Sequence, residues 1–443
     1  MDPSDNVTAR LADFASNCPV DAAPGVRPAI RRALLDSIGV AVAGSDHQAS
    51  RIIVDHVRST TTAAGAATII ASSSRTDPAN AALANAVMAH VLDFDDTLLP
   101  TRLHPSAALV PALLAVAEAH DLSGERVMDG FAVGYELMAR MAEATYPDFA
   151  ERGWHGTGIF GGVGVAAAVG RLISLDSERM AHAIGLGATG GSGVVHVFGS
   201  MAKAINIGRA AATGIQSAYL ARDGFTASSE ILGSDRSFLD LYAAQPAFAR
   251  VTQDLGADWA VLRNGYKPYP CGVVAHAAID AVIVLRERAP TTDLQQLRLT
   301  VSKETMRLMG NPDPTGELEA KFSVRYASAA AWLDGVVEPS TFEDERVGSP
   351  RSLAAMQRTN ITVDDGMPQD AAIAEVDTTD GWHGREEVLH ARGTLSRPMT
   401  DAELGEKFLR LVGRRLDGEL VLQAIMSFEQ VRIRDLMEEL AAD

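Results

Sequence analysis

The sequence contains few cysteines and few aromatic residues. Only Cys18 and Cys271 occur among its 443 residues, so no disulfide framework or cysteine-rich metal site can be built. Aromatic residues make up 5% of the chain, which is little for a pocket that stabilises carbocations. The chemistry of the protein must therefore depend on other side chains.

Positive charge is also scarce relative to negative charge. The chain has 39 Lys and Arg residues against 57 Asp and Glu residues, a net charge of −18. Such a surface repels phosphate groups, so we expect no nucleic acid and no membrane as a partner. No apolar run is long enough to span a bilayer. The stretch Met1–Ala15, with Asp2, Asp5 and Asp13, lacks the pattern of a signal peptide. We expect a cytoplasmic protein.

The first part of the chain has helical periodicity. Val7, Leu11 and Phe14 fall on one helical face, Pro78 precedes an Ala-rich run, and Pro105 precedes another. The run Gly161–Gly164 is rich in glycine, but no Lys-Ser/Thr pair follows it, so it does not predict a phosphate-binding loop.

Beyond Tyr266 the periodicity changes to that of strands. Segments 297–301, 360–363 and 373–376 alternate or are β-branched, and Asp380-Gly381 suits a hairpin turn. Thr400 and Glu403 then form a capping box before a final helical region. The prediction is a mainly α protein with an α+β second domain: a large all-helical domain, 1–266 completed by 396–443, and a smaller α+β lid domain, 267–395.

The segment Asp93-Phe94-Asp95-Asp96-Thr97 is the first candidate for chemistry. Three carboxylates follow an apolar helix, and Asp93 and Thr97 would share one face if the helix continued. His104 stands before Pro105 at the predicted start of a helix, where an imidazole tends to remain neutral and able to act as a base. The pattern is equally compatible with carboxylates that solvate a loop and a histidine that caps a helix.

Four further stretches carry reactive side chains among small or rigid residues. His155 lies in Gly153–Gly158, Lys203 follows Gly-Ser-Met, Lys267 precedes Pro-Tyr-Pro-Cys, and Tyr326 ends Lys-Phe-Ser-Val-Arg-Tyr. Taken singly, His155 could belong to a surface loop and Lys203 could be a solvated lysine. No His or Cys pair has metal-ligand spacing, so we expect no metal.

Together and in this order, these motifs resemble the MmgE/PrpD family over most of the chain. That family contains 2-methylcitrate dehydratases, cis-aconitate decarboxylases and iminodisuccinate epimerases. The resemblance implies a helical domain, an α+β lid, a cleft between them, a homodimer and no cofactor. It implies a lyase, or alternatively an epimerase, that acts on a small di- or tricarboxylate substrate.

The resemblance also implies roles for individual residues. Catalytic roles fall on His104, His155, Lys203, Asp93 and Tyr326, and substrate binding falls on Thr97, Lys267 and Lys203. The lysines would hold carboxylates and stabilise an enolate, and one or both histidines would transfer the proton. Asp93 would orient or tune one of these histidines.

Several positions depart from the family's pattern. Gly156 stands where Pro commonly follows the histidine, Ala204 and Asn206 replace a frequent Arg and His, and Gly272 and Val273 replace a frequent His and Arg. Fewer cations suggest a substrate with fewer carboxylates than citrate, or one placed differently.

Two other classes of protein also have helical folds that would fit. A terpene-synthase-like enzyme would bind magnesium through its Asp-rich motif, but the second Asn/Asp-Ser/Thr-Glu cluster is missing from the sequence. A binding protein without catalytic activity could keep the fold, but it would have no need for His104, His155, Lys203 and Lys267 together.

Overall fold

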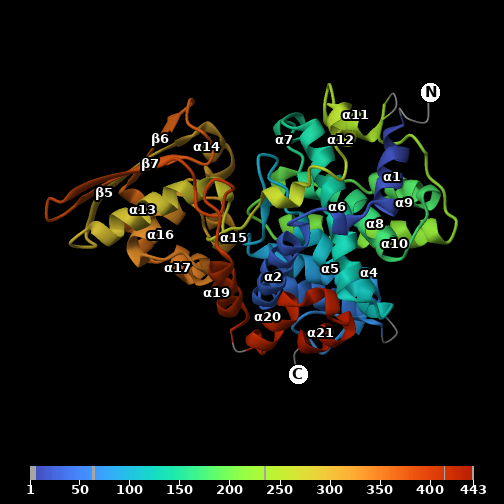
Figure 1. The fold of residues 1–443 in the computed structure, drawn as a ribbon. Coiled ribbons are helices and arrows are strands. Elements are labelled where there is room, and N and C mark those ends of the chain that lie inside the picture. The colour runs from blue at the N-terminus through green and yellow to red at the C-terminus, as the bar shows by residue number, and fades with distance from the viewer. Residues whose placement is uncertain (1–5, 62–64, 234–235, 414, 442–443) are drawn as a thin grey trace.

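The protein consists of a large group of helices and a smaller part built on one sheet (Figure 1). The structure is a computed structural model that describes residues 6–61, 65–233, 236–413 and 415–441. Met1–Asp5, part of the stretch Met1–Ala15 that lacks the pattern of a signal peptide, lie outside these residues. No described helix is both long enough and apolar enough to cross a membrane.

The helical part is built around helices that are buried on nearly every side. Small residues let these helices approach closely: a Cβ atom on Gly134 would lie 2.6 Å from the carbonyl oxygen of Gly164. The helices before the sheet are α1 Val7–Asn17, α2 Val26–Gly44, α3 Gln48–Thr60, α4 Pro78–Val91, α5 Pro105–Ala119, α6 Gly124–Thr145, α7 Asp148–Glu151, α8 Gly156–Leu172, α9 Ser177–Thr189, α10 Ala202–Arg222, α11 Phe238–Tyr242 and α12 Phe248–Thr252. The glycine-rich run Gly161–Gly164 lies inside α8, so it is helical and forms no phosphate-binding loop.

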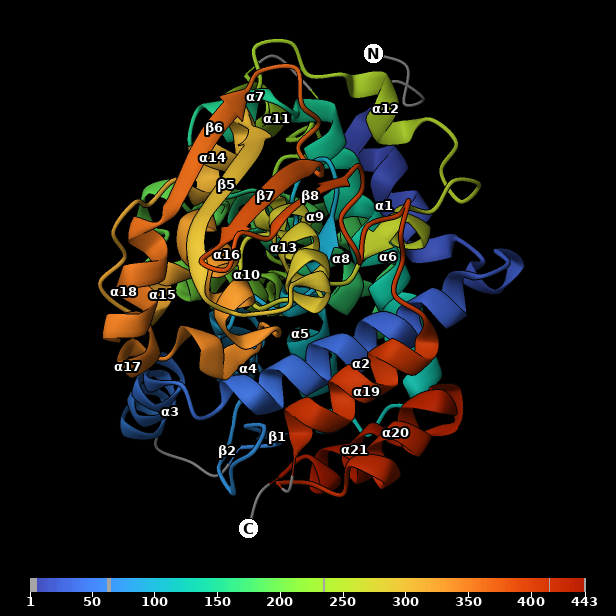
Figure 2. The same ribbon diagram turned by 90° about the vertical axis from the view of Figure 1, so that its left-hand side faces the viewer.

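The sheet contains four strands in the order β6-β5-β7-β8. Strand β5 pairs with β6 in parallel and with β7 in antiparallel, and β7 and β8 form the predicted hairpin. Helices α13 and α16 pack against one face (Figures 1 and 2). The strands are β5 Leu294–Ser302, β6 Thr359–Asp364, β7 Ala372–Thr378 and β8 His383–Val388, and the helices are α13 His276–Arg288, α14 Lys303–Met309, α15 Glu317–Ala320, α16 Val324–Asp334, α17 Asp344–Val347 and α18 Pro350–Gln357.

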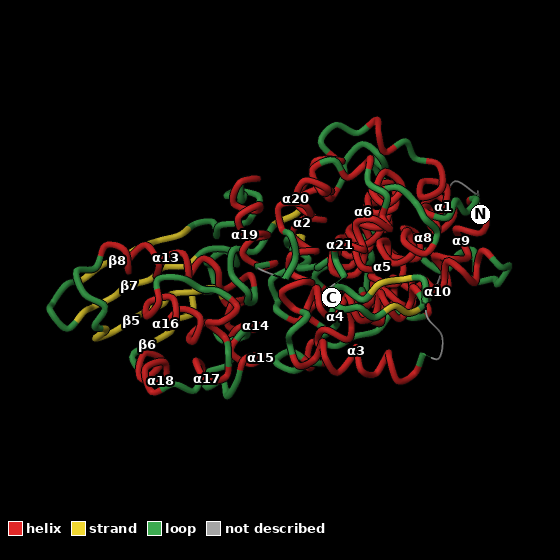
Figure 3. Tube along the Cα trace, turned by 90° about the horizontal axis from the view of Figure 1, so that it is seen from below, coloured by secondary structure: helices red, strands yellow, loops and turns green. Residues whose placement is uncertain are grey.

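After the sheet the chain returns to the helical part. Helix α19 (Asp401–Val412) begins at the predicted Thr400–Glu403 capping box and packs along α2. Its buried Lys407 donates to Asp36 Oδ1 at 2.7 Å and to the carbonyl oxygens of Phe94 and Lys267 at 2.8 and 2.9 Å. Helices α20 (Gly418–Met426) and α21 (Ile433–Glu439) follow (Figure 3). Through Lys407, helix α19 thus holds in place the segments around Phe94 and Lys267, which belong to the site described below.

Two large hydrophobic clusters divide the chain. One joins buried residues between Val7 and Tyr266 with those between Met399 and Leu440, and the other joins residues between Tyr269 and Ala391. The mainly helical fold with a smaller α+β part is as the sequence predicted. We propose domain boundaries at 266/267 and 395/396, because the two clusters separate there.

Candidate active site

The Asp-rich motif lies in a loop, not on a helix. Helix α4 ends at Val91, and Asp93 adopts a left-handed φ of 52°, a conformation that Asp tolerates better than most residues. Thr97 already belongs to the short strand β3 (Thr97–Leu98). The prediction that Asp93 and Thr97 share a helical face is therefore wrong, because the backbone turns sharply at Asp93. We call residues 93–97 the aspartate loop.

A two-residue strand brings the domain joint to this loop. Strand β3 pairs antiparallel with β4 (Asn264–Gly265), with Thr97 opposite Gly265. The contact is close, because a Cβ atom on Gly265 would lie 3.1 Å from the carbonyl oxygen of Thr97. Lys267 follows two residues later and thereby reaches the aspartate loop.

Both predicted lysines bind the same carboxylate oxygen. Asp93 Oδ1 accepts from Lys203 Nζ at 2.9 Å and from Lys267 Nζ at 2.7 Å, while Asp93 Oδ2 is buried without a partner. Burial disfavours the ionised carboxyl, but the two ammonium groups outweigh it and hold the pKa of Asp93 well below its usual value. Two cations against one anion leave net positive charge, which suits an anionic ligand.

His104 lies at the N-terminus of α5, as predicted. Its backbone N–H donates to Thr157 Oγ1 at 2.8 Å, and its Nδ1 lies 2.8 Å from the carbonyl oxygen of Asp96. A carbonyl oxygen only accepts, so Nδ1 carries the proton and Nε2 keeps a lone pair. Burial lowers the pKa of His104 well below its usual value, although Asp95 opposes this. The ring is a neutral imidazole with a basic Nε2.

His155 lies at the N-terminus of α8 and has the opposite tautomer. Its Nδ1 lies 3.2 Å from Asn206 Nδ2, and its Nε2 is buried without a partner. The amide nitrogen of Asn206 donates, so Nδ1 accepts and Nε2 carries the hydrogen. Burial also lowers the pKa of His155 well below its usual value, and the charge of Lys203 adds to this. His155 therefore presents a donor and His104 an acceptor.

His90, which the sequence analysis missed, completes this group. It is fully buried in α4, its Nδ1 lies 2.7 Å from Asp95 Oδ2, and its Nε2 lies 2.8 Å from Lys203 Nζ. Its position three residues before Asp93, about one helical turn, was the available signal.

Six of the predicted side chains line one pocket. Its polar lining includes Asp93, Thr97, His104, His155, Lys203 and Lys267, and its apolar lining includes Phe149, Trp154, Phe198, Leu308, Met309 and Phe322. The structure thus brings together six of the seven predicted site residues in this pocket, whereas His90, which bonds Lys203, does not line it.

Two arginines in the same pocket were also missed. Arg102 from the loop before His104 and Arg307 from α14 both bond the carboxylate of Glu304, which also belongs to α14. Because two guanidinium groups share one carboxylate, this end of the pocket is also positive. Arg102 stands two residues before His104, but only the fold shows that it meets α14.

Tyr326 does not line the pocket. Its hydroxyl donates to the carbonyl oxygen of Thr341, and its ring packs beside Phe342 at a centroid distance of 5.7 Å. The side chain is 1% exposed and belongs to the hydrophobic cluster of the sheet-containing part. The structure gives Tyr326 a packing role and shows no contact with the other predicted site residues.

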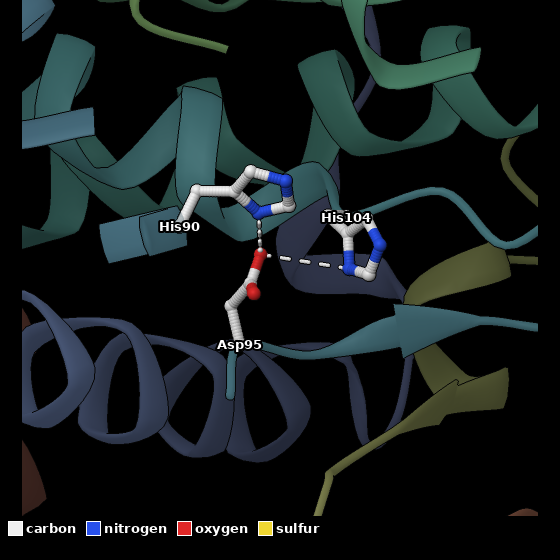
Figure 4. A group of neighbouring side chains, drawn as sticks. All are labelled: His90, Asp95 and His104. Carbon is white, nitrogen blue, oxygen red and sulfur yellow. Dashed lines mark hydrogen bonds and ion pairs between the residues drawn. The ribbon is translucent and has the colours of Figure 1, made fainter. Parts of the chain in front are cut away.

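Among the described residues, one group has the geometry of possible metal ligands: His90, Asp95 and His104. Figure 4 shows the carboxylate of Asp95 between the Nδ1 atoms of the two rings, 2.7 Å from His90 and 3.5 Å from His104. Both Nδ1 atoms carry protons, that of His90 in its hydrogen bond to Asp95 and that of His104 in its hydrogen bond to the carbonyl oxygen of Asp96, whereas a ligating nitrogen must have a free lone pair. The ammonium group of Lys203 beside His90 also repels a cation. The donors fit a hydrogen-bonded network better than a metal.

Comparison with known proteins agrees with this geometry. Residues 9–250 match the MmgE/PrpD N-terminal domain, and residues 269–428 match the MmgE/PrpD C-terminal domain. The chain is 26% identical to a cis-aconitate decarboxylase-like protein, oryM, of Aspergillus oryzae, over 94% of this chain and 92% of the relative. It is 26% identical to human cis-aconitate decarboxylase, over 78% and 75%, and 25% identical to cis-aconitate decarboxylase of Aspergillus terreus, over 93% and 90%.

The two domain matches argue against the terpene-synthase-like interpretation, and the cis-aconitate decarboxylase relatives support a lyase over a binding protein without catalytic activity. Each aspartate of the motif also has its own partner, Asp93 in the lysines, Asp95 in His90, and Asp96 in Ser106 and Asn264. The chain belongs to the MmgE/PrpD family and is a lyase of that type.

Proposed function

We propose that the protein is a cofactor-independent dehydratase or decarboxylase that acts on a small di- or tricarboxylic acid of the 2-methylcitrate or cis-aconitate type. The single observation that carries the proposal is the pair of buried ammonium groups on Asp93 Oδ1, next to two neutral imidazoles of opposite tautomer. The named relatives, all cis-aconitate decarboxylases or similar to them, support the same chemistry.

The number of cations supports a substrate with more than one carboxylate. Lys203 and Lys267 provide net positive charge at the aspartate loop, and Arg102 and Arg307 provide it beside Glu304. Although the sequence suggested few cations, the fold adds these arginines. A substrate with a carboxylate at each end binds both cationic regions, so its carbon skeleton is held between His104 and the apolar walls.

In a dehydration, His104 Nε2 removes a proton from the carbon next to a carboxylate. The electron pair moves into the carboxylate to form an enediolate, which Lys203 and Lys267 stabilise. It then returns to form the double bond as the hydroxyl group leaves, taking a proton from Lys203. His155 Nε2–H donates to an oxygen of the substrate without losing its proton, as a neutral imidazole does.

In a decarboxylation, the bond between carbon and a carboxylate breaks and CO₂ leaves. The electron pair of that bond remains on the substrate, where the lysines stabilise the negative charge until carbon takes a proton from Lys203 Nζ, and solvent later replaces that proton. Thr97 holds the polar side of the substrate in place, and Asp93 holds the two lysines in place. Tyr326 has no part in these steps, because its hydroxyl is bonded within the lid.

The test is a screen of the purified protein in deuterated water against citrate-, aconitate-, malate- and aminosuccinate-type acids, with products identified by mass. Loss of water, or loss of CO₂ with uptake of deuterium on carbon, is the expected result. Exchange of deuterium on carbon without loss of water or of CO₂ would favour the epimerase alternative. No turnover of any of these acids would contradict the proposal.

We also propose a cytoplasmic homodimer, as the family resemblance and the acidic composition suggest. Light scattering on the purified chain measures its mass in solution. A monomer at working concentration would contradict the dimer.

A further inference from the structure

His90 packs against both pocket histidines without lining the pocket. Its ring centroid is 4.9 Å from that of His104 and 5.8 Å from that of His155. The side chain is fully buried, and both of its nitrogens have partners. A buried imidazole with two defined partners has a defined orientation and tautomer.

The carboxylate of Asp95 decides this tautomer. Asp95 Oδ2 accepts a hydrogen bond from His90 Nδ1 at 2.7 Å, so Nδ1 carries the proton. The lone pair is then on Nε2, which faces Lys203 Nζ at 2.8 Å. Burial and the charge of Lys203 hold the pKa of His90 well below its usual value, so the ring stays neutral and accepts.

An ammonium group has three N–H donors, and two of those on Lys203 are used. One donates to His90 Nε2 at 2.8 Å and another to Asp93 Oδ1 at 2.9 Å. The rings of Phe198 and Phe322 lie 5.3 and 5.6 Å from Nζ and enclose it. No third acceptor occurs among the residues that the structure describes, and Lys203 lines the pocket. The remaining N–H is therefore available to a substrate.

We propose that His90, with its tautomer fixed by Asp95, is a positioning residue that aims the third N–H of Lys203 into the pocket and keeps this ammonium group charged. The role in turnover rests on the proposed function, because Lys203 is there the group that stabilises the enediolate and supplies a proton. His90 itself does not touch the substrate.

Several charged groups surround Lys203 and share control of its proton. Burial lowers the pKa of Lys203, and Asp93 and then Asp95 oppose this, whereas Lys267 adds to it. Lys321 of the lid lines the same small cavity as His90 and Lys203, and His155 faces Lys203 from α8. A hydrogen-bond acceptor on an ammonium group favours the charged form. Loss of His90 therefore moves the alkaline limb of the rate profile to lower pH.

Two substitutions of similar size separate the two nitrogens of His90. In His90→Gln the side-chain oxygen can take the place of Nε2, so the bond from Lys203 is kept. In His90→Asn the shorter amide can take the place of Nδ1 and bond Asp95, but it cannot reach Lys203. We expect His90→Asn to lower kcat roughly 100-fold, because the third N–H of Lys203 is no longer aimed at the substrate and the loss of one stabilising donor has about this effect. KM should change less than about threefold. His90→Gln should recover a large part of kcat.

The pH profile and a control complete the experiment. The alkaline limb should move to lower pH in His90→Asn and less in His90→Gln, with melting temperature as the measure of folding. His182→Gln is the matched control, because His182 is a half-buried histidine of α9 that accepts from Ala227 N–H and does not line the pocket; it should behave as wild type.

Three results would overturn the proposal. These are equal kcat in His90→Gln and His90→Asn, better activity in His90→Asn, or an unmoved alkaline limb in both. If the wild-type enzyme converts no carboxylic acid, the proposed function fails, but nitrogen NMR of labelled lysine still measures the pKa of Lys203 in each variant. An unchanged Lys203 pKa in His90→Asn would then reject the positioning role by itself.

Discussion

His104 donates its Nδ1 proton to the backbone carbonyl oxygen of Asp96 across 2.8 Å. A carbonyl oxygen has no proton to donate, so this bond makes Nδ1 the protonated nitrogen of His104 and Nε2 the basic one. A proton-transferring group of this kind contributes roughly 100- to 10,000-fold to the rate. We therefore expect His104→Asn to lower kcat by about that factor and to remove the acidic limb of the pH profile.

The folding control for this variant is the melting temperature. Asn at the N-terminus of α5 is a good capping residue, so stability should change little. A His104→Asn enzyme that keeps near wild-type turnover would shift the role of base to His155, and the tautomer of His155 would then be the reverse of the one described above.

Lys203→Met tests the charge of the site. The ammonium group serves both the bound carboxylate and the enediolate, so its loss should raise KM and lower kcat together. This differs from His90→Asn, which keeps the Lys203 side chain but no longer positions it, and which should change mainly kcat. Steady-state kinetics of both variants on one substrate make the comparison. A Lys203→Met enzyme with unchanged KM would show that Lys203 does not hold the substrate carboxylate.

The sequence predicted elements whose signals are local. The helix after Pro105, the hairpin at Asp380-Gly381 and the Thr400 capping box depend on turn and cap chemistry within a few residues, and all three are present. The continued helix through Thr97 was wrong, because nothing local to the motif indicates that the chain turns at Asp93. That turn is stabilised by contacts with Lys203 and Lys267, which are distant in sequence.

The same reason explains what was missed in the site. The role of Arg102 depends on Glu304, about two hundred residues later, and His90 matters through Lys203. In contrast, His155 and Lys267 were found because small or rigid residues surround them in the sequence. Tyr326 was carried over from a looser motif, and its neighbours in the fold are Thr341 and Phe342, which no spacing in that motif indicates.

Arg102→Gln tests the second carboxylate. Arg102 is 13% exposed and bonds Glu304 across the two parts of the protein. A hydrogen bond to a charged group contributes about 1.5–3 kcal/mol, so KM for a dicarboxylate should rise roughly 10- to 100-fold. A substrate whose remote carboxylate is an amide should show a smaller rise.

Arg298→Gln is the control for this prediction, because Arg298 pairs with Asp377 on the sheet and does not line the pocket. Equal increases in KM for the acid and its amide would mean that Arg102 only joins the two parts of the protein.

Asp96 gives a prediction for stability against pH. Burial raises the pKa of this carboxyl to about 7, even though Ser106 and Asn264 donate to it. A raised pKa means that the folded state binds the proton more tightly than the unfolded state, so this contribution to stability is present below about pH 4 and is lost as pH rises to 7. Asp96→Asn should remove that dependence and gain stability relative to wild type as pH rises. Chemical denaturation of both proteins at several pH values measures the difference, and parallel curves would contradict the assignment.

The last prediction concerns metal ions. Among the described residues only His90, Asp95 and His104 come together in the manner of ligands. The hydrogen bonds from His90 to Asp95 and from His104 to the carbonyl oxygen of Asp96 place a proton on each Nδ1, and the charge of Lys203 lies beside His90. A metal would have to displace those protons and overcome that charge. We expect full activity after exhaustive chelation and no increase on adding divalent ions, with metal content measured by mass spectrometry before and after treatment. Activity that is lost on chelation and restored by a divalent ion would show instead that these three residues are a metal site.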